Sequence, residues 1–369
     1  MSIRSASGED ARILIAAFQG WSNAGDATTE AVAHLTEMLG NEVIHTISGE
    51  QYCDLQLNRP RVSRDEDGKR IISWPDTTLW GPVRRPEIEQ LAGIAELAEL
   101  EGLPVPAGAV EAVAADRVTR LDGTAVTDLF VLSGVEPTRD WSAFSEEIVD
   151  LVDVWDIDVV VFLGALFADA PHTRPIVTTL SSEDSALREA LEAEKATYEG
   201  PAGVLTAVDL ALNARDVPTV ALWAQVPHYV HSAPSPKATL ALLDKLEEIL
   251  DIFVPRGDLL DQATDWENNI NNIANVDEEM SRYITRLEEA RDELHAADGA
   301  GDALALEFER FLGADQHLLK SDSSGVSPHT QTDADSDSNA RSVADDRADE
   351  HAEDASDVEP PEEGQASQK

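Results

Sequence analysis

Short apolar segments alternate with amphipathic segments along most of this chain. The apolar segments are bounded by turn residues, as buried strands are, and the amphipathic segments repeat apolar residues every three or four positions, as helices do. This alternation predicts an α/β fold, a three-layer sandwich with a mainly parallel sheet. The most apolar strand, Asp158–Leu163, is expected at the sheet centre. The predicted strands are Ile13–Phe18, Val43–Ile47, Thr127–Leu132, Asp158–Leu163 and Thr219–Trp223, and the predicted helices are Ala27–Leu39, Trp141–Trp155, Glu183–Ala196 and Pro236–Asp251.

Two stretches interrupt the alternation inside the predicted core domain, residues 1–257. Residues 59–64 and 69–74 are short strand patterns on either side of Gly68, which predicts an antiparallel hairpin. Residues 83–122 are rich in Ala, Gly and Pro and carry only helical patches. We expect them to be an insertion rather than part of the sheet.

The pattern changes again after residue 257. Apolar residues recur at spacings of three and four from Trp266 to Leu294, which predicts amphipathic helix with a break near Asn275. A last helix is predicted over Asp302–Leu312. We therefore expect a small helical subdomain at 258–313, followed by a tail at 314–369.

Charge separates the tail from the rest of the chain. The 369 residues hold 72 acidic and 27 basic side chains, a formal net charge of −45. Residues 321–369 contribute 14 acidic and 3 basic residues, and they have no Leu, Ile, Phe, Tyr or Trp to bury, so we expect the tail to be disordered. The net charge of the whole chain predicts no nucleic-acid partner, because phosphate contacts need clustered Lys and Arg, and no membrane partner, because anionic lipid surfaces repel it. The remaining residues still carry a net charge of −34. Any macromolecular partner should be basic or bind a local apolar patch.

Sequence signals of location agree with one another. Cys53 is the single cysteine, so an internal disulfide and a CxxC metal pair are excluded. Residues Met1–Asp10 are polar and lack the apolar region of a signal peptide. The longest apolar run, Val159–Ala168, is too short to cross a bilayer. We expect a soluble, cytoplasmic protein.

The first candidate site is the turn-rich loop between the strand at 13–18 and the helix at 27–39. Such a loop can present the free N–H groups of the helix start to a phosphate. However, it lacks the GxGxxG and P-loop spacings, no Lys follows its glycines, and Asp26 would repel an anion. Ser22 is also one residue out of register for a GxSxG nucleophile. Two interpretations remain open, a tight turn that caps the helix and a ligand loop formed by Gly20, Trp21, Ser22, Asn23 and Asp26.

The second candidate site is Asp169–Pro175, directly after the most apolar strand. Ligands of α/β proteins bind at the carboxyl ends of strands. In a ligand site, His172 would act as an acid or base and Arg174 would bind an anion. The structural alternative is that His172 caps a turn and Arg174 pairs with one of the many carboxylates.

The third candidate is the pair His228 and His231. Two histidines three residues apart can face one metal ion on a helix. Pro227, Pro234 and Pro236 argue against a helix here, and no HExxH motif is present. We therefore predict no metal site and no cofactor, and keep His228 as a hypothetical ligand-binding residue.

Six segments carry a family resemblance and lie in matching order over residues 12–312: Leu14–Asp26, Tyr52–Arg61, Gly134–Pro137, Leu163–Pro175, Tyr198–Gly203 and Leu222–Thr239. Together they resemble the proteasome assembly chaperone 2 family, and its actinobacterial branch most. Residues 83–122 and the acidic tail lie outside the resemblance. It implies an α/β sandwich similar to the phosphorylase/hydrolase-like group, with a small C-terminal helical region.

The resemblance also implies a function. Eukaryotic members hold proteasome α subunits during ring assembly, so the first hypothesis is a non-enzymatic protein-binding or assembly factor with proteasome subunits as candidate partners. We also expect a homo-oligomer, because relatives of this fold self-associate. The alternative is a phosphorylase/hydrolase-like enzyme, or a binder of nucleotide or phosphate, in which the strand-end loops converge on a pocket. No complete catalytic set is present in the sequence, which favours the first hypothesis.

Overall fold

The computed structural model describes most of the predicted core and the beginning of the helical subdomain. The described residues are 2–8, 10–65, 67–82, 117–231 and 234–293. Most of the predicted insertion 83–122, the predicted helix Asp302–Leu312 and the predicted tail 314–369 lie outside them.

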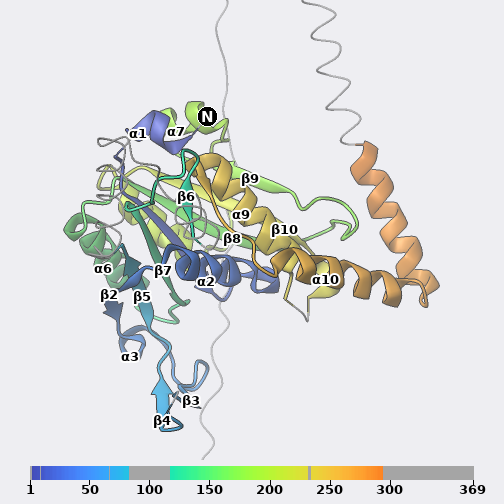
Figure 1. Cartoon of the computed structure of the whole chain (residues 1–369), viewed down its shortest axis with the longest axis horizontal. Coiled ribbons are helices and arrows are strands. Elements are labelled where there is room, and N and C mark those ends of the chain that lie inside the picture. The colour runs from blue at the N-terminus through green and yellow to red at the C-terminus, as the bar shows by residue number, and fades with distance from the viewer. Residues whose placement is uncertain (1, 9, 66, 83–116, 232–233, 294–369) are drawn as a thin grey trace, which may run out of the picture. The chain divides into compact units, whose positions relative to one another are not determined.

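A seven-stranded mixed sheet forms the centre of the described fold (Figure 1). Its strands are β1 (Ile13–Gln19), β2 (Glu42–Ile47), β5 (Thr77–Gly81), β7 (Leu129–Val135), β8 (Val159–Ala168), β9 (Thr178–Ser181) and β10 (Thr219–Pro227). The order is β2-β5-β7-β1-β8-β10-β9, and β7, β1, β8 and β10 pair in parallel. β5 and β9 are antiparallel to their neighbours. The predicted α/β fold with a mainly parallel sheet is confirmed.

Helices cover both faces of this sheet and complete the predicted three layers. The helices are α1 (Ile3–Ser7), α2 (Ala27–Leu39), α3 (Gly49–Tyr52), α6 (Trp141–Val154), α7 (Ser185–Leu191), α8 (Val204–Asn213), α9 (Pro236–Leu250) and α10 (Leu259–Ala274). On one face, α2 and α9 pack together over Ile13 and Ile15 of β1. On the other face, α6 and α8 pack over Leu14 and Phe18. β1 reads as a continuous apolar run because alternate residues enter two separate cores.

The structure corrects the predicted centre of the sheet. The middle strand of the seven is β1, and β8 lies between β1 and β10. The strongly apolar run from Val159 to Leu163 is buried on both faces, as the residues of β1 are. An apolar run therefore indicates that helices cover both faces of a strand, and it does not report the strand's place in the order.

Other differences concern short elements. α7 is shorter than the predicted helix, because the Asp184 side chain accepts the Leu187 amide at its start and Glu192 adopts a left-handed φ of 52° at its end. β10 continues beyond Trp223 to Pro227. Strands β5 and β9, helix α8, and the short pair β6 (Thr119–Arg120) and β11 (Ile252–Phe253) were not predicted.

The predicted hairpin is present as β3 (Arg61–Arg64) and β4 (Arg70–Ser73). Its antiparallel register places Val62 opposite Ile72 and Arg64 opposite Arg70. All eight strand residues are exposed, and Figure 1 shows the hairpin apart from the seven-stranded sheet.

The described part of the predicted helical subdomain consists of α10 and a second helical segment, residues 278–293. The chain turns between them at 275–277, close to the predicted break. α10 packs against α9. Within the described residues, no helix combines the length and the apolar character that crossing a membrane requires.

Candidate functional site

The loops that follow the parallel strands gather at one edge of the sheet. β1, β7, β8 and β10 run in the same direction, so the loops after Gln19, Val135, Ala168 and Pro227 leave from the same side. This is the edge where open α/β sheets bind ligands. The three candidate sites predicted from the sequence all lie in these loops.

In the first loop, Asn23 caps helix α2. Its Oδ1 accepts the backbone N–H of Thr28 at 3.0 Å and of Thr29 at 3.2 Å, and also the Thr28 hydroxyl at 2.7 Å. A helix binds an anion at its start through unpaired N–H groups, and Asn23 already satisfies two of them. Asp26 adopts a left-handed φ of 51° at the same turn. The geometry favours the capping interpretation of this loop over the phosphate-binding one.

Glu136, after β7, joins the first loop to helix α8. Its Oε2 accepts the Trp21 amide at 2.8 Å and its Oε1 accepts the Val204 amide at 2.9 Å. The carboxylate thus faces the positive end of α8, where negative charge is stabilising. Gly20 has φ 140°, and a Cβ there would lie 2.6 Å from a carboxylate oxygen of Glu136. The close approach of this carboxylate requires glycine at position 20.

A groove opens beside this contact, with a volume of about 400 Å³. Its lining comes from the loop after β1, the loop after β7, the turn before α8 and residues 57–58. Trp21 and Leu57 are 73% and 76% exposed. We call this feature the strand-end groove, lined by Gln19, Gly20, Trp21, Leu57, Asn58, Val135, Glu136, Pro137, Thr138, Trp141, Ala202 and Gly203.

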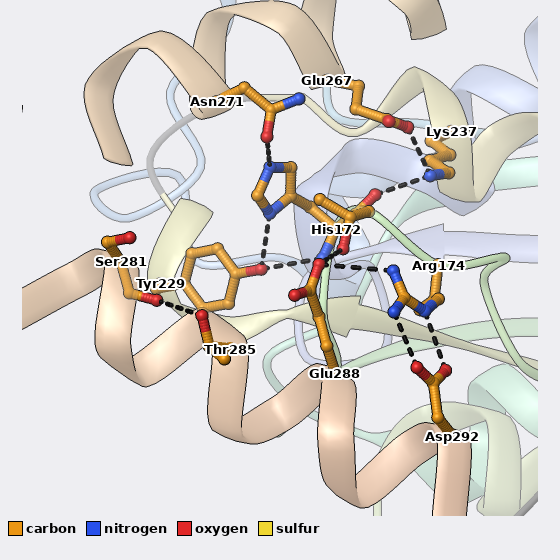
Figure 2. A network of polar contacts seen from close by, with 11 residues as sticks. His172, Arg174, Tyr229, Lys237, Glu267, Asn271, Ser281, Thr285, Glu288 and Asp292 are labelled. Carbon is orange, nitrogen blue, oxygen red and sulfur yellow. Dashed lines mark hydrogen bonds and ion pairs between the residues drawn. The ribbon is translucent and has the colours of Figure 1, made fainter. Parts of the chain in front are cut away.

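His172 lies in the second loop and is completely buried. Its Nε2 faces Asn271 Oδ1 at 3.1 Å and its Nδ1 faces the Tyr229 hydroxyl at 2.8 Å, as Figure 2 shows. The Tyr229 hydroxyl also accepts the His172 amide at 2.7 Å. A neutral imidazole with its proton on Nε2 satisfies all three contacts, since Nε2 donates to Asn271 and Nδ1 accepts from Tyr229.

Burial lowers the pKa of His172. The hydrogen bond that His172 donates to Asn271 and the negative charges of Glu267 and Glu288 oppose this shift, whereas the positive charge of Lys237 adds to it. Burial also raises the pKa of Tyr229 to about 12. Both side chains therefore stay neutral near pH 7 and act as hydrogen-bonding groups.

The neighbouring polar side chains of the second loop contact the same C-terminal helices (Figure 2). Arg174 donates to both carboxylate oxygens of Asp292, at 2.9 and 2.7 Å, and to Glu288 at 3.3 Å. The Thr173 hydroxyl donates to Glu288. Lys237 connects the His172 carbonyl, at 2.6 Å, to Glu267 on α10, at 2.5 Å. We call these contacts the His172 network, formed by His172, Thr173, Arg174, Tyr229, Lys237, Glu267, Asn271, Glu288 and Asp292.

His228 lies in a single 3-10 turn, His228–Val230, and not on an α-helix. Its Nδ1 is 3.2 Å from Asp169 Oδ1, which also accepts the Tyr283 hydroxyl at 3.1 Å. The rings of His228 and Tyr283 meet edge to face. Among the described residues, no group of three or more His, Cys, Asp or Glu side chains is placed to hold a metal ion.

The candidate residues therefore fall into two arrangements. Gly20 and Trp21 line the strand-end groove, whose lining includes none of residues 169–175. His172 and Arg174 belong to the His172 network. The two loops are connected through the start of α9, where the Ser235 amide donates to Gly25 and Lys237 contacts His172. Within the described residues, no hydrogen bond joins the buried Ser22 hydroxyl to a histidine or a carboxylate.

Several residues of these arrangements were not predicted. Glu136 lies in the Gly134–Pro137 segment and Tyr229 directly follows His228, but neither was assigned a role. Glu288 and Asp292 are four residues apart and therefore share one helix face, a spacing that could have indicated a paired cation. Nothing in the local sequence connects that cation to Arg174.

The fold and the site together define an α/β sandwich protein whose strand-end loops are partly covered by a C-terminal helical segment. The chain belongs to the PAC2 family, whose model matches residues 17–274. This confirms the resemblance to the proteasome assembly chaperone 2 family, and with it a proteasome-assembly-chaperone-like protein.

Solved structures agree with this assignment. A PAC2 family protein from Streptomyces avermitilis is 35% identical, with a TM-score of 0.59, over 73% of this chain and 98% of its own. A proteasome-assembly chaperone homologue from Mycobacterium tuberculosis is 34% identical, with a TM-score of 0.56, over 74% and 99%. A protein of unknown function from Mycobacterium tuberculosis, 21% identical over 78% and 86% with a TM-score of 0.60, is similar in fold alone. No curated protein matches this chain by sequence.

Proposed function

We propose that this protein is a non-enzymatic assembly factor that binds protein subunits at the strand-end groove. The observation that carries the proposal is a division of roles at the sheet edge. The polar candidates Asn23, His172 and Arg174 make internal contacts, whereas Trp21 and Leu57 are exposed beside the groove. Exposed aromatic and aliphatic side chains next to a groove are typical of protein-binding sites.

Proteasome subunits are the partners we propose to test first. The support is the relative from Mycobacterium tuberculosis that is described as a proteasome-assembly chaperone homologue. We further propose that the protein works in the cytoplasm as a homo-oligomer. Its net charge of −45 suits partners with basic surfaces, because complementary potentials speed association and select partners.

The test is binding of purified proteasome subunits from the source organism to the full chain, measured by biolayer interferometry. Trp21→Ala removes the most exposed aromatic ring of the groove and should weaken binding by about 30-fold, which corresponds to about 2 kcal/mol. Leu210→Ser is the matched control, because Leu210 is an exposed apolar residue on α8 outside the groove lining. It should leave binding unchanged.

Two results would contradict the proposal: no binding of any subunit by the wild type, or equal loss in Trp21→Ala and Leu210→Ser. The small-molecule alternative makes a different prediction. A nucleotide or phosphate that binds the groove would raise the melting temperature of the wild type, and Trp21→Ala would reduce that shift.

A further inference from the structure

The β3–β4 hairpin is unlike the rest of this acidic chain. Residues 59–70 hold five of its 27 basic residues and three acidic ones, so the segment is net positive in a chain of net charge −45. Five exposed large apolar side chains also lie between positions 57 and 74. They are Leu57, Val62, Ile71, Ile72 and Trp74.

The register of the hairpin separates its two faces. Side chains alternate along a strand, so Val62 and Arg64 of β3 share a face with Ile72 and Arg70 of β4. On that face an apolar pair, 56% and 52% exposed, lies next to a directly opposed pair of arginines. We call it the Val62 face.

The Val62 face is not stabilised from within the described chain. Like charges directly opposite one another on neighbouring strands are destabilising, and an isolated two-stranded hairpin is marginal in water. Arg64 donates to the Gly68 carbonyl at 2.6 Å, and Arg70 makes no ion pair with any other described residue. A partner that supplies carboxylates to the arginines and apolar surface to Val62 and Ile72 would relieve both penalties.

We propose that the Val62 face is the self-association surface of this protein and that its occupant is the acidic body of a second copy. This rests on the self-association included in the proposed function. Charge complementarity selects the occupant, since the chain outside its last 49 residues still carries a net charge of −34. Two Val62 faces paired with each other would offer no carboxylate to either pair of arginines. The hairpin of one copy therefore binds the acidic surface of another copy outside its own hairpin. In a dimer each copy would bind the other in this way, and in a larger oligomer the same contact would repeat around a ring.

The experiment measures the mass of the full chain by light scattering and sedimentation velocity, from about 1 to 100 μM protein. We expect an oligomer that dissociates at higher ionic strength, as charge-driven contacts between exposed groups do. Two double variants disrupt the face in independent ways, Val62→Ser with Ile72→Ser and Arg64→Glu with Arg70→Glu. Each double variant should raise the dissociation constant of the oligomer at least about tenfold, because like charges or unmatched polar groups placed at an interface weaken binding by at least that factor.

Matched controls keep the outcome interpretable. Leu210→Ser removes an exposed apolar side chain on α8, and Arg215→Glu reverses an exposed arginine whose partner is Glu146. Both should leave the oligomer intact. All eight strand residues of the hairpin are exposed and lie outside both cores, so the double variants should fold like the wild type. Their circular dichroism spectra and melting temperatures should match those of the wild type, measured at a concentration where the wild type is monomeric.

Lys69 provides a second readout. A zero-length carbodiimide cross-linker applied to mixed unlabelled and 15N-labelled chains should join Lys69 of one copy to a carboxylate of another. The assignment of the Val62 face is overturned if the oligomer persists in both double variants and no such intermolecular cross-link forms. That result would still support self-association through another surface. A wild type that is monomeric at every concentration overturns both.

Discussion

Replacing His172 with Leu should release the C-terminal helices from the sheet edge. The substitution places an apolar side chain of similar size in a completely buried position and removes both ring nitrogens. The Asn271 amide then loses the group that donates to it, and the Tyr229 hydroxyl keeps only the backbone amide at 172.

The magnitude follows from these contacts. Each lost hydrogen bond costs about 1 kcal/mol net, and a buried polar group left without a partner adds about 1 kcal/mol or more. The total is about 3 kcal/mol, a large share of the roughly 5–15 kcal/mol that stabilises a typical protein. For a domain of this size it corresponds to a fall in melting temperature of about 6–12 °C.

The assay is hydrogen–deuterium exchange read by mass spectrometry, together with thermal unfolding. Faster exchange is expected in α10 and in residues 278–293, whereas the central strands β1 and β8 should keep their protection at moderate temperature. His231→Leu is the matched control, since His231 is exposed and its one side-chain hydrogen bond within the described residues is to the His228 carbonyl, at 3.2 Å. It should change the free energy of unfolding by no more than about 0.5 kcal/mol. If His172→Leu melts and exchanges like His231→Leu, the His172 network does not hold the helical segment.

Two further predictions concern pH and Glu136. Burial lowers the pKa of His172 below its value in the unfolded chain, so the unfolded chain takes up the proton at a higher pH than the folded protein does. The free energy of unfolding should therefore fall as the pH drops below about 6.5, by at most about 1.4 kcal/mol per pH unit. The difference in that free energy between wild type and His172→Leu, measured by urea unfolding, should shrink over the same range. A difference that grows toward pH 5 would contradict this sign. Glu136→Gln replaces one of the two acceptor oxygens with a donor that faces a backbone N–H. It should lower the free energy of unfolding by about 2 kcal/mol and speed amide hydrogen exchange at Trp21 and Val204. The control Glu199→Gln, at an exposed position, should change neither quantity. Equal stability of the two variants would refute the role of Glu136.

The fold could be predicted where each element carries its own signal. Helix Ala27–Leu39 has the predicted bounds because Gly40 ends it with a left-handed φ of 63°, and the apolar faces of α6 and α9 are continuous. The hairpin was also visible, from two strand patterns around Gly68. The strand order was not, because β2 pairs with β5 at the edge of the sheet and no local pattern encodes that choice.

The candidate site could be predicted only in part, for a related reason. The sequence placed His172 and Arg174 in a loop at a strand end, and Arg174 does pair with carboxylates, as the structural alternative stated. Its partner is 118 residues away, and Asn271 is 99 residues from His172. Such contacts depend on how the C-terminal helices return to the sheet, which periodicity does not determine. Asn23 lies five residues from Thr28, so this contact is local, and a tight turn that caps the helix was among the open interpretations.

The strand-end groove and the hairpin are continuous in the chain, and this links the two proposed interactions. Leu57 and Asn58 line the groove, and β3 begins three residues later at Arg61. A second copy bound to the Val62 face therefore lies beside the exposed edge of the groove. If that copy also contacts Leu57, subunit binding and self-association share a residue, and each must change the affinity of the other by the same factor. Two measurements would then agree. If a bound subunit raises the mean oligomer mass, subunit affinity should be higher above the oligomer dissociation constant than below it, and if it lowers the mass, that affinity should be lower.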